Sequence, residues 1–238
     1  MIRINPLNST KFLEDFKSSK IYLDLKKDYD LMDADPNKFN QWYGNRNPRE
    51  VVGRKIWENE QTYMSLNPFY YLQFLLETNP ASIIDIGCGW NIFKKYIPEV
   101  VGVDYKHPDG ADIVQYYDNT FVENYYQTYD AGFSINGPVC SDPRDLKELH
   151  DQLLLFSELI RPGGRGFVSF VKPWNRSFER AMNWLEVNSY NKSSITEDVL
   201  IDDVYHTINQ GKFKIVCFDS NAFGRASPDG DIKIVFEK

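Results

Sequence analysis

The sequence predicts an α/β fold in which a mostly parallel, doubly wound sheet of seven strands carries helices on both faces. Short apolar runs alternate with helical segments from about residue 67 to the end of the chain. Turn-prone residues separate the last two runs, which predicts an antiparallel hairpin at the C-terminus. Ligands bind such sheets at the carboxyl ends of the strands, so a functional site is expected at that edge.

The expected strands are short apolar runs bounded by polar residues or glycine. They fall at residues 82–86, 100–104, 111–114, 129–135, 166–171, 213–218 and 232–236, and the third run is the weakest. A short helix is expected at residues 91–96 and another at 178–187. A longer helix is expected to start at Asp142-Pro143 and to end at the Arg-Pro-Gly-Gly turn of residues 161–164, because glycine terminates helices.

The first 66 residues differ from the rest, since they are polar, aromatic and rich in helix signals. One helix is expected to start at Ser9 or Thr10 and to run towards Leu25, and a second spans about residues 48–64. We therefore expect an N-terminal helical extension or lid at residues 1–66. The sheet domain is expected at 67–238, opening with a helix at Asn67-Pro68 that stops before residue 79.

Composition and charge limit the classes of function. The 238 residues are 42% hydrophobic, and 27 Lys and Arg against 34 Asp and Glu give a net charge of −7. Such a balance disfavours binding a nucleic-acid backbone over a wide surface. Three scattered cysteines without a CxxC motif indicate neither a metal site nor a disulfide framework. Without a signal peptide or an apolar stretch of about 18 residues, we expect a cytoplasmic protein without a membrane partner.

The string Asp85-Ile86-Gly87-Cys88-Gly89 carries the most chemical information, because it ends the first strand and opens a short helix. Glycines at positions 87 and 89 let the backbone turn tightly and approach a ligand. The following helix offers free N–H groups and the positive end of its dipole. About fifteen residues later the second strand ends in Asp104. A carboxylate at that position can accept both hydroxyls of a ribose.

These strings resemble the motifs of the class I S-adenosylmethionine-dependent methyltransferases. Residues 85–89 resemble the first glycine motif, and residues 101–104 resemble the second, acid-ended strand. Residues 129–136 resemble the fourth strand, and residues 159–166 resemble the glycine turn before the fifth. The resemblance covers residues 67–238, about seven-tenths of the chain. It implies a Rossmann-like fold with S-adenosylmethionine as the cofactor.

The resemblance also implies a set of cofactor-binding residues. They are Asp85, Gly87, Cys88, Gly89, Asp104, Tyr105, Asp118, Asn136 and Gly137. Residues 85–89 border the methionine and ribose, and Asp85 orders the loop or meets the amino group. Asp104 binds the ribose hydroxyls, with Tyr105 beside the adenine. Residues 136–137 lie near the sulfonium and its methyl group.

The sequence departs from the family pattern at three places. Asn91 stands where the family usually has a third glycine. The acid that often meets the adenine amino group falls at Tyr116, so Asp118, two residues later, is the expected contact. The Asn-Pro-Pro-Tyr signature of nucleic-acid amino methyltransferases is absent, since residues 136–139 read Asn-Gly-Pro-Val.

Each feature also has a purely structural interpretation. Gly87 and Gly89 could end a strand in a fold that binds no nucleotide. A nicotinamide site requires a third glycine where Ile92 stands. Asp104 could cap a helix. Cys88, for which no histidine partner is evident, is better interpreted as a small packing residue than as a nucleophile.

Two loops combine an aromatic ring with a cation, a pairing that suits an anionic or planar substrate. One follows the fifth strand and contains Trp174 and Arg176; the other lies in the N-terminal part and contains Trp42 and Arg46. We expect these four residues to bind substrate. The alternative is that each loop simply packs on the core.

The resemblance predicts methyl transfer to a small molecule, such as a sugar or another metabolite. No catalytic residue is predicted, because the sulfonium is already activated and the protein mainly positions the displacement. Aminopropyl transfer on the same fold would require paired acids where residues 136–138 read Asn-Gly-Pro. A non-catalytic binding or scaffold module stays open, and cofactor binding distinguishes it. The sequence gives no indication of the oligomeric state.

Overall fold

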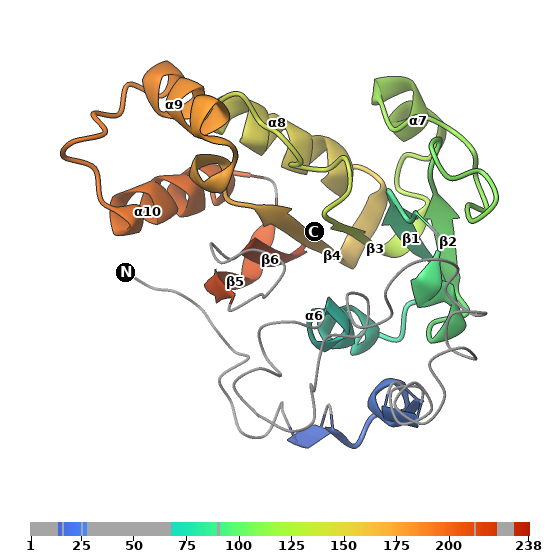
Figure 1. Cartoon of the computed structure of the whole chain (residues 1–238). Helices are drawn as coiled ribbons and strands as arrows, with labels where there is room; N and C mark the ends of the chain where they lie inside the picture. Colours follow the sequence, from blue (N-terminus) through green and yellow to red (C-terminus); the bar gives the residue numbers. More distant parts are fainter. Residues whose placement is uncertain are drawn as a thin grey trace, which may run out of the picture.

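The computed structural model describes residues 14–27 without 16 and 25, 68–89, 91–211, 213–222 and 231–238. This part of the chain contains six strands: β1 Ile83–Ile86, β2 Val100–Val103, β3 Tyr129–Ile135, β4 Ile160–Val171, β5 Lys214–Ala222 and β6 Asp231–Glu237. They form one sheet in the order β2-β1-β3-β4-β6-β5 (Figure 1). The first four are parallel, whereas β6 is antiparallel to both β4 and β5. The expected α/β sheet and its C-terminal hairpin are therefore confirmed.

Helices cover both faces of the sheet. The α-helices are α6 Pro68–Leu76, α7 Asn119–Asn124, α8 Leu146–Ser157, α9 Phe178–Val187 and α10 Glu197–Ile208, and the 3-10 helices are η2 Ile92–Lys95 and η3 Pro173–Asn175. Helix α6 lies on one face, and α8 and α10 lie on the other (Figure 1). The face of the sheet that lies against α6 also packs against η2 and against Ile21 of the N-terminal part.

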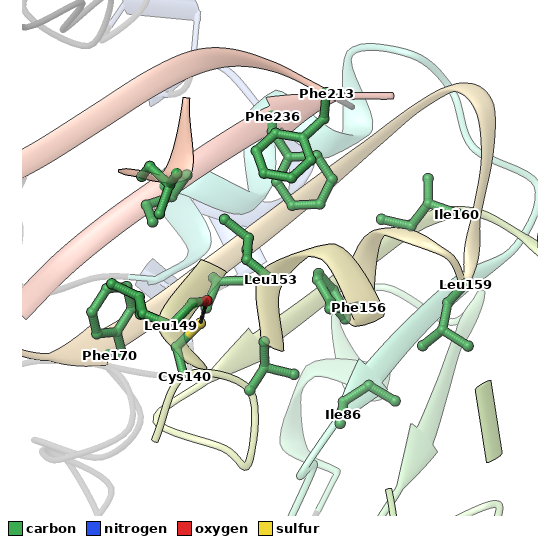
Figure 2. Close-up of a cluster of buried hydrophobic side chains, with 14 of the residues drawn as sticks. Ile86, Cys140, Leu149, Leu153, Phe156, Leu159, Ile160, Phe170, Phe213 and Phe236 are labelled. Carbon is green, nitrogen blue, oxygen red and sulfur yellow. Dashed lines mark hydrogen bonds between the residues drawn. The ribbon is translucent and has the colours of Figure 1, made fainter. Parts of the chain in front are cut away.

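The larger part of the core lies between the sheet and helices α8 and α10. Figure 2 shows Phe156 of α8 near the C-terminal hairpin, whose Phe236 stacks obliquely on Phe213 at 4.7 Å between ring centroids. Phe156 meets the Phe236 ring edge-on at 6.1 Å. Burying such rings supplies much of the hydrophobic stabilisation of the domain.

The third of the seven expected strands, at residues 111–114, is wrong for the described structure. Its only ladder contact is an isolated bridge between Ile113 and Val103. The amides of Asp112 and Ile113 both donate to the carbonyl of Gly102, which ends the pairing after one residue. Val114 is exposed, so no apolar face holds the run against the sheet.

The boundaries around α8 also differ from the expectation. The N-cap is Asp145, whose carboxylate accepts from the Glu148 amide at 2.7 Å, and not Asp142-Pro143. The helix ends at Ser157, and residues 161–164 belong to β4 rather than to a helix terminus. Gly163 has a φ of +84°, and its amide donates to the carbonyl of Lys238 at 2.7 Å. Pairing with the C-terminus therefore extends the strand through the glycine turn.

Further differences concern helices. The expected helix at residues 91–96 is the single 3-10 turn η2, and neither α7 nor α10 was predicted. The signal for α10 was present, because Leu200, Ile201, Val204 and Ile208 follow helical spacing and are all buried. The helix expected at residues 48–64 lies outside the described residues, so the N-terminal extension stays a prediction.

Gly166 of β4 provides a test of the core packing. A Cβ on Gly166 would lie 2.2 Å from Cζ of Phe236, whose ring is held by its aromatic neighbours. We expect Gly166→Ala to lower the free energy of unfolding by about 1–3 kcal/mol through overpacking, measured by urea denaturation. The double variant Gly166→Ala with Phe236→Leu should recover part of the loss, whereas strictly additive losses would contradict this packing.

Candidate functional site

The glycine loop after β1 is held by the end of β2. The amides of Gly87 and Cys88 both donate to the carbonyl of Val103, at 2.8 and 3.1 Å. Gly87 and Gly89 have φ values of +80° and +55°, the left-handed region that glycine adopts at least cost. The chain therefore turns sharply here because glycine can adopt these φ values, and the loop passes over the carboxyl edge of the sheet.

The carboxyl group of Asp85 lies directly beneath this loop. Asp85 is 1% exposed, and its Oδ2 is buried without a hydrogen-bond partner. Burial, reinforced by the negative charge of Asp104, raises the pKa of Asp85 well above its ordinary value. A buried acid with a free acceptor oxygen suits a cationic group of a ligand, whose charge would favour the ionised form.

Asp104, one residue beyond β2, connects the two loops at this edge. Its Oδ2 accepts from the Gly89 amide at 3.0 Å, and its Oδ1 accepts from the amides of Lys106 and His107 at 2.7 and 3.1 Å. These bonds fix the side chain beside the glycine loop. A carboxylate offers about four acceptor positions, so three backbone donors leave room for about one more.

Asn91 explains how the chain dispenses with the third glycine. It adopts the left-handed conformation with a φ of +52°, which asparagine tolerates better than most residues. Its side chain lies over Gly102, where a Cβ would come within 2.6 Å of the asparagine Cγ. Its Nδ2 donates to Oδ2 of Asp112 at 2.9 Å.

Asp112 completes this arrangement and was missed by the sequence reasoning. Its Oδ2 also accepts from the Gly102 amide at 2.9 Å, and its Oδ1 pairs with Lys94 of η2. Partial burial raises the pKa of Asp112, but hydrogen bonds from Lys94, Gly102 and Asn91 outweigh it and lower the pKa below the ordinary 3.8. The sequence signal was weak, since it consisted of one acid in a poor strand.

The loop after β3 packs against the glycine loop. Asn136 is exposed at a φ of +50°, and its amide donates to the carbonyl of Ser169 at 2.8 Å. A Cβ on Gly137 would lie 2.4 Å from the carbonyl oxygen of Ile86. A Cβ on Gly87 would lie 2.5 Å from Cδ of Pro138. Residues 85–89 and 136–137 are thus brought together in the fold.

The region beyond β2 presents exposed aromatic rings. Tyr105 and Tyr116 are 50% and 59% exposed and meet edge-to-face, with ring centroids 4.9 Å apart. Asp118, the expected adenine contact, instead caps α7 by accepting from the Phe121 amide at 2.9 Å. The two tyrosines therefore mark the open surface beside Asp104, and the Asp118 carboxylate has a structural role of its own.

The structure places Cys88 as a buried packing residue. Burial, with the charges of Asp85, Asp104 and Asp112, raises the pKa of Cys88 to about 12. The thiolate is therefore scarce at neutral pH, and the residue is a poor nucleophile. No group of His, Cys, Asp or Glu suited to a metal ion is found among the described residues.

The predicted substrate residues divide into two pairs. Trp174 is half-buried on η3 and packs against Trp184 of α9, with ring centroids 5.5 Å apart. Arg176 donates to the carbonyl of Ser141. Both residues thus follow β4 at the carboxyl edge but have contacts within the fold. Trp42 and Arg46 lie outside the described residues, so their role stays a prediction.

A scan against protein-family models finds no match, and a search of curated proteins finds none either. Among the described residues, no helix is long and apolar enough to span a membrane.

Several solved structures resemble this chain at low identity. The N-methyltransferase NodS from Bradyrhizobium japonicum is 11% identical with a TM-score of 0.45, and the match covers 79% of this chain and 99% of NodS. The methyltransferase CalH, solved with S-adenosylhomocysteine, is 15% identical with a TM-score of 0.45, over 71% of this chain and 54% of CalH. A methyltransferase from Archaeoglobus fulgidus is 14% identical with a TM-score of 0.40, over 72% and 95%. At these identities and TM-scores the resemblance carries no argument about function.

The Asp112 contacts predict a pH-dependent stability. Because the folded pKa of Asp112 is lowered, its ionised form stabilises the fold above the ordinary value of 3.8, and this is lost as the pH falls through the folded pKa. We expect Asp112→Asn to cost about 1.5–3 kcal/mol at pH 7, the range for hydrogen bonds to a charged group. The cost should shrink below pH 3.8 in urea titrations. A cost that is constant with pH would contradict this role.

Proposed function

We propose that this chain binds S-adenosylmethionine at the carboxyl edge of β1, β2 and β3 and transfers its methyl group to a small molecule. The observation that carries the proposal is the buried Asp85 carboxyl, with an unpartnered oxygen, beneath a glycine loop fixed by Asp104. An α-ammonium group is the ligand cation that would supply the missing partner. The strand order and the ordered series of sequence motifs support the same conclusion.

Different residues are expected to contact different parts of the ligand. Asp85 faces the methionine ammonium, and the backbone at Gly87 and Gly89 lies against the methionine and ribose. Asp104 has room for about one ribose hydroxyl, because three backbone amides already use its oxygens. The exposed Tyr105 and Tyr116 offer ring faces to the adenine.

S-adenosylmethionine supplies an electrophilic methyl group on a sulfonium, so the protein needs mainly to hold the donor and acceptor in line. The exposed Asn136 lies at the end of β3 and can orient a polar acceptor by its side-chain amide. Gly137 keeps this loop close to the carbonyl of Ile86, where any side chain would collide. The net charge of −7 favours a small acceptor over a nucleic acid.

Asp104 tests the ribose position. We expect Asp104→Ala to weaken binding of both S-adenosylmethionine and S-adenosylhomocysteine by about 1–3 kcal/mol, because a charge-assisted hydrogen bond and the Gly89 contact are lost. Isothermal titration calorimetry measures both constants, and Asp109→Ala in the same loop is the matched control. Unchanged affinities in a folded variant would contradict the ribose position. Binding of neither ligand to the wild type would favour the scaffold alternative.

Asp85 tests the ammonium position through pH. Its raised pKa means that the carboxyl must lose a proton to pair with a cation, so affinity should rise as the pH increases through that pKa. Calorimetry in buffers of different ionisation heat should show proton release on binding. Asp85→Asn should bind more weakly and lose the release. Equal proton release from the variant would count against this role of Asp85.

A further inference from the structure

The face of the sheet below α6 changes from apolar to polar towards the carboxyl edge. One row across the sheet is apolar in register: Phe133, Phe167, Val235 and Cys217. Two residues nearer the edge, the next row holds Ser169 of β4, Lys233 of β6 and Asp219 of β5, again in register. These three residues point to the same face because they are cross-strand partners. We call them the polar row.

All three side chains of the polar row are buried, at 2%, 4% and 8% exposure for Ser169, Lys233 and Asp219. Tyr71 of α6 donates its hydroxyl to Oδ2 of Asp219. The Lys233 ammonium lies over the Tyr71 ring, 5.5 Å from its centroid. With the residues that the structure describes, it makes neither a hydrogen bond nor an ion pair. Asp231, two residues away on β6, is also buried.

Such a row is costly in a core that otherwise buries apolar side chains. Lys233 is 4% exposed and its ammonium has no paired carboxylate among the described residues, so the contact with the Tyr71 ring offsets only part of its lost hydration. Burial accordingly lowers the pKa of Lys233, and the charges of Asp231, Asp219 and Cys217 only partly oppose this. Apolar residues at these positions would continue the preceding row at no such cost. The polar row therefore indicates a ligand rather than packing.

The polar row lies beside the loop that carries Asn136. The carbonyl of Ser169 accepts from the Asn136 amide, and Ile135 pairs with Ser169 in register. In the proposed function, this loop lies near the methyl-bearing sulfur. The polar row is thus on the acceptor side of the cofactor.

We propose that Ser169, Lys233 and Asp219 form the acceptor-binding site and take a small uncharged molecule that carries hydroxyl or amino groups. An ammonium donor, a hydroxyl and a carboxylate acceptor side by side match such groups. Two neighbouring carboxylates, Asp219 and Asp231, repel phosphate. This inference rests on the proposed function, because it takes the cofactor position from it.

The position of the polar row relative to the cofactor can be tested before the acceptor is known. S-adenosylmethionine carries one more positive charge than S-adenosylhomocysteine, so the ratio of their dissociation constants reports nearby charges. Unit charges about 12 Å apart at an effective dielectric constant of about 20 change a binding constant about tenfold. We expect Lys233→Met to shift the ratio at pH 6 by about tenfold in favour of S-adenosylmethionine, measured by calorimetry. Asp219→Asn should shift it the opposite way.

Lys214→Met is the matched control, because it removes the same charge from an exposed side chain of β5 at the far end of the hairpin. Its ratio should equal that of the wild type. Equal ratios for the wild type, Lys233→Met and Asp219→Asn would overturn the inference while leaving the cofactor site intact. Failure of the wild type to bind either ligand would instead overturn the proposed function.

Inorganic phosphate tests the chemical class of the acceptor. We expect millimolar phosphate to leave the affinity for S-adenosylhomocysteine unchanged in the wild type and in Lys233→Met at constant ionic strength. A phosphate effect that disappears in Lys233→Met would assign an anionic acceptor to the polar row and overturn the class proposed here.

Discussion

The contact between the loops after β1 and β3 is the constraint on which the rest of the site depends. The loops approach so closely that a Cβ on Gly87 would lie 2.5 Å from Pro138, and a Cβ on Gly137 would lie 2.4 Å from the Ile86 carbonyl oxygen. Because the two loops touch, the carboxyl ends of two neighbouring strands present one continuous backbone surface. The carboxyl groups of Asp85 and Asp104 therefore both lie next to this one surface rather than next to separate loops.

Carboxyl groups are concentrated around this backbone surface. Asp85 lies beneath the glycine loop, Asp104 lies beside it, and Asp112 contacts Asn91 and Lys94 just after it. Burial raises the pKa of Cys88, the field of these carboxylates raises it further, and the reactivity of the thiol is thus suppressed. The same field favours a ligand with positive charge, such as an ammonium or a sulfonium. Lys233 lies outside this group, on the far side of β3 from β1, and is buried.

Much of the fold was accessible from the sequence, because apolar runs and turn residues act locally. The strand Tyr129–Ile135 and the helix Phe178–Val187 were predicted at their observed bounds. The strand at residues 111–114 was wrong because its pairing depends on Gly102, which Asp112 and Ile113 both contact. The glycine turn at 161–164 was misassigned because its partner, Lys238, is the C-terminal residue and lies far away in the sequence.

The sequence by itself determined the order along the chain of the six observed strands, the glycine loop and the acid at the end of the second strand, since each is encoded by adjacent residues. Tertiary structure alone decided that Asn91 adopts the left-handed conformation in place of a third glycine and donates to Asp112, and that Asp118 caps a helix. It also decided that Ser169, Lys233 and Asp219 share a row. The physical reason is that register places residues from three strands side by side, and no local pattern in any one strand records its partners.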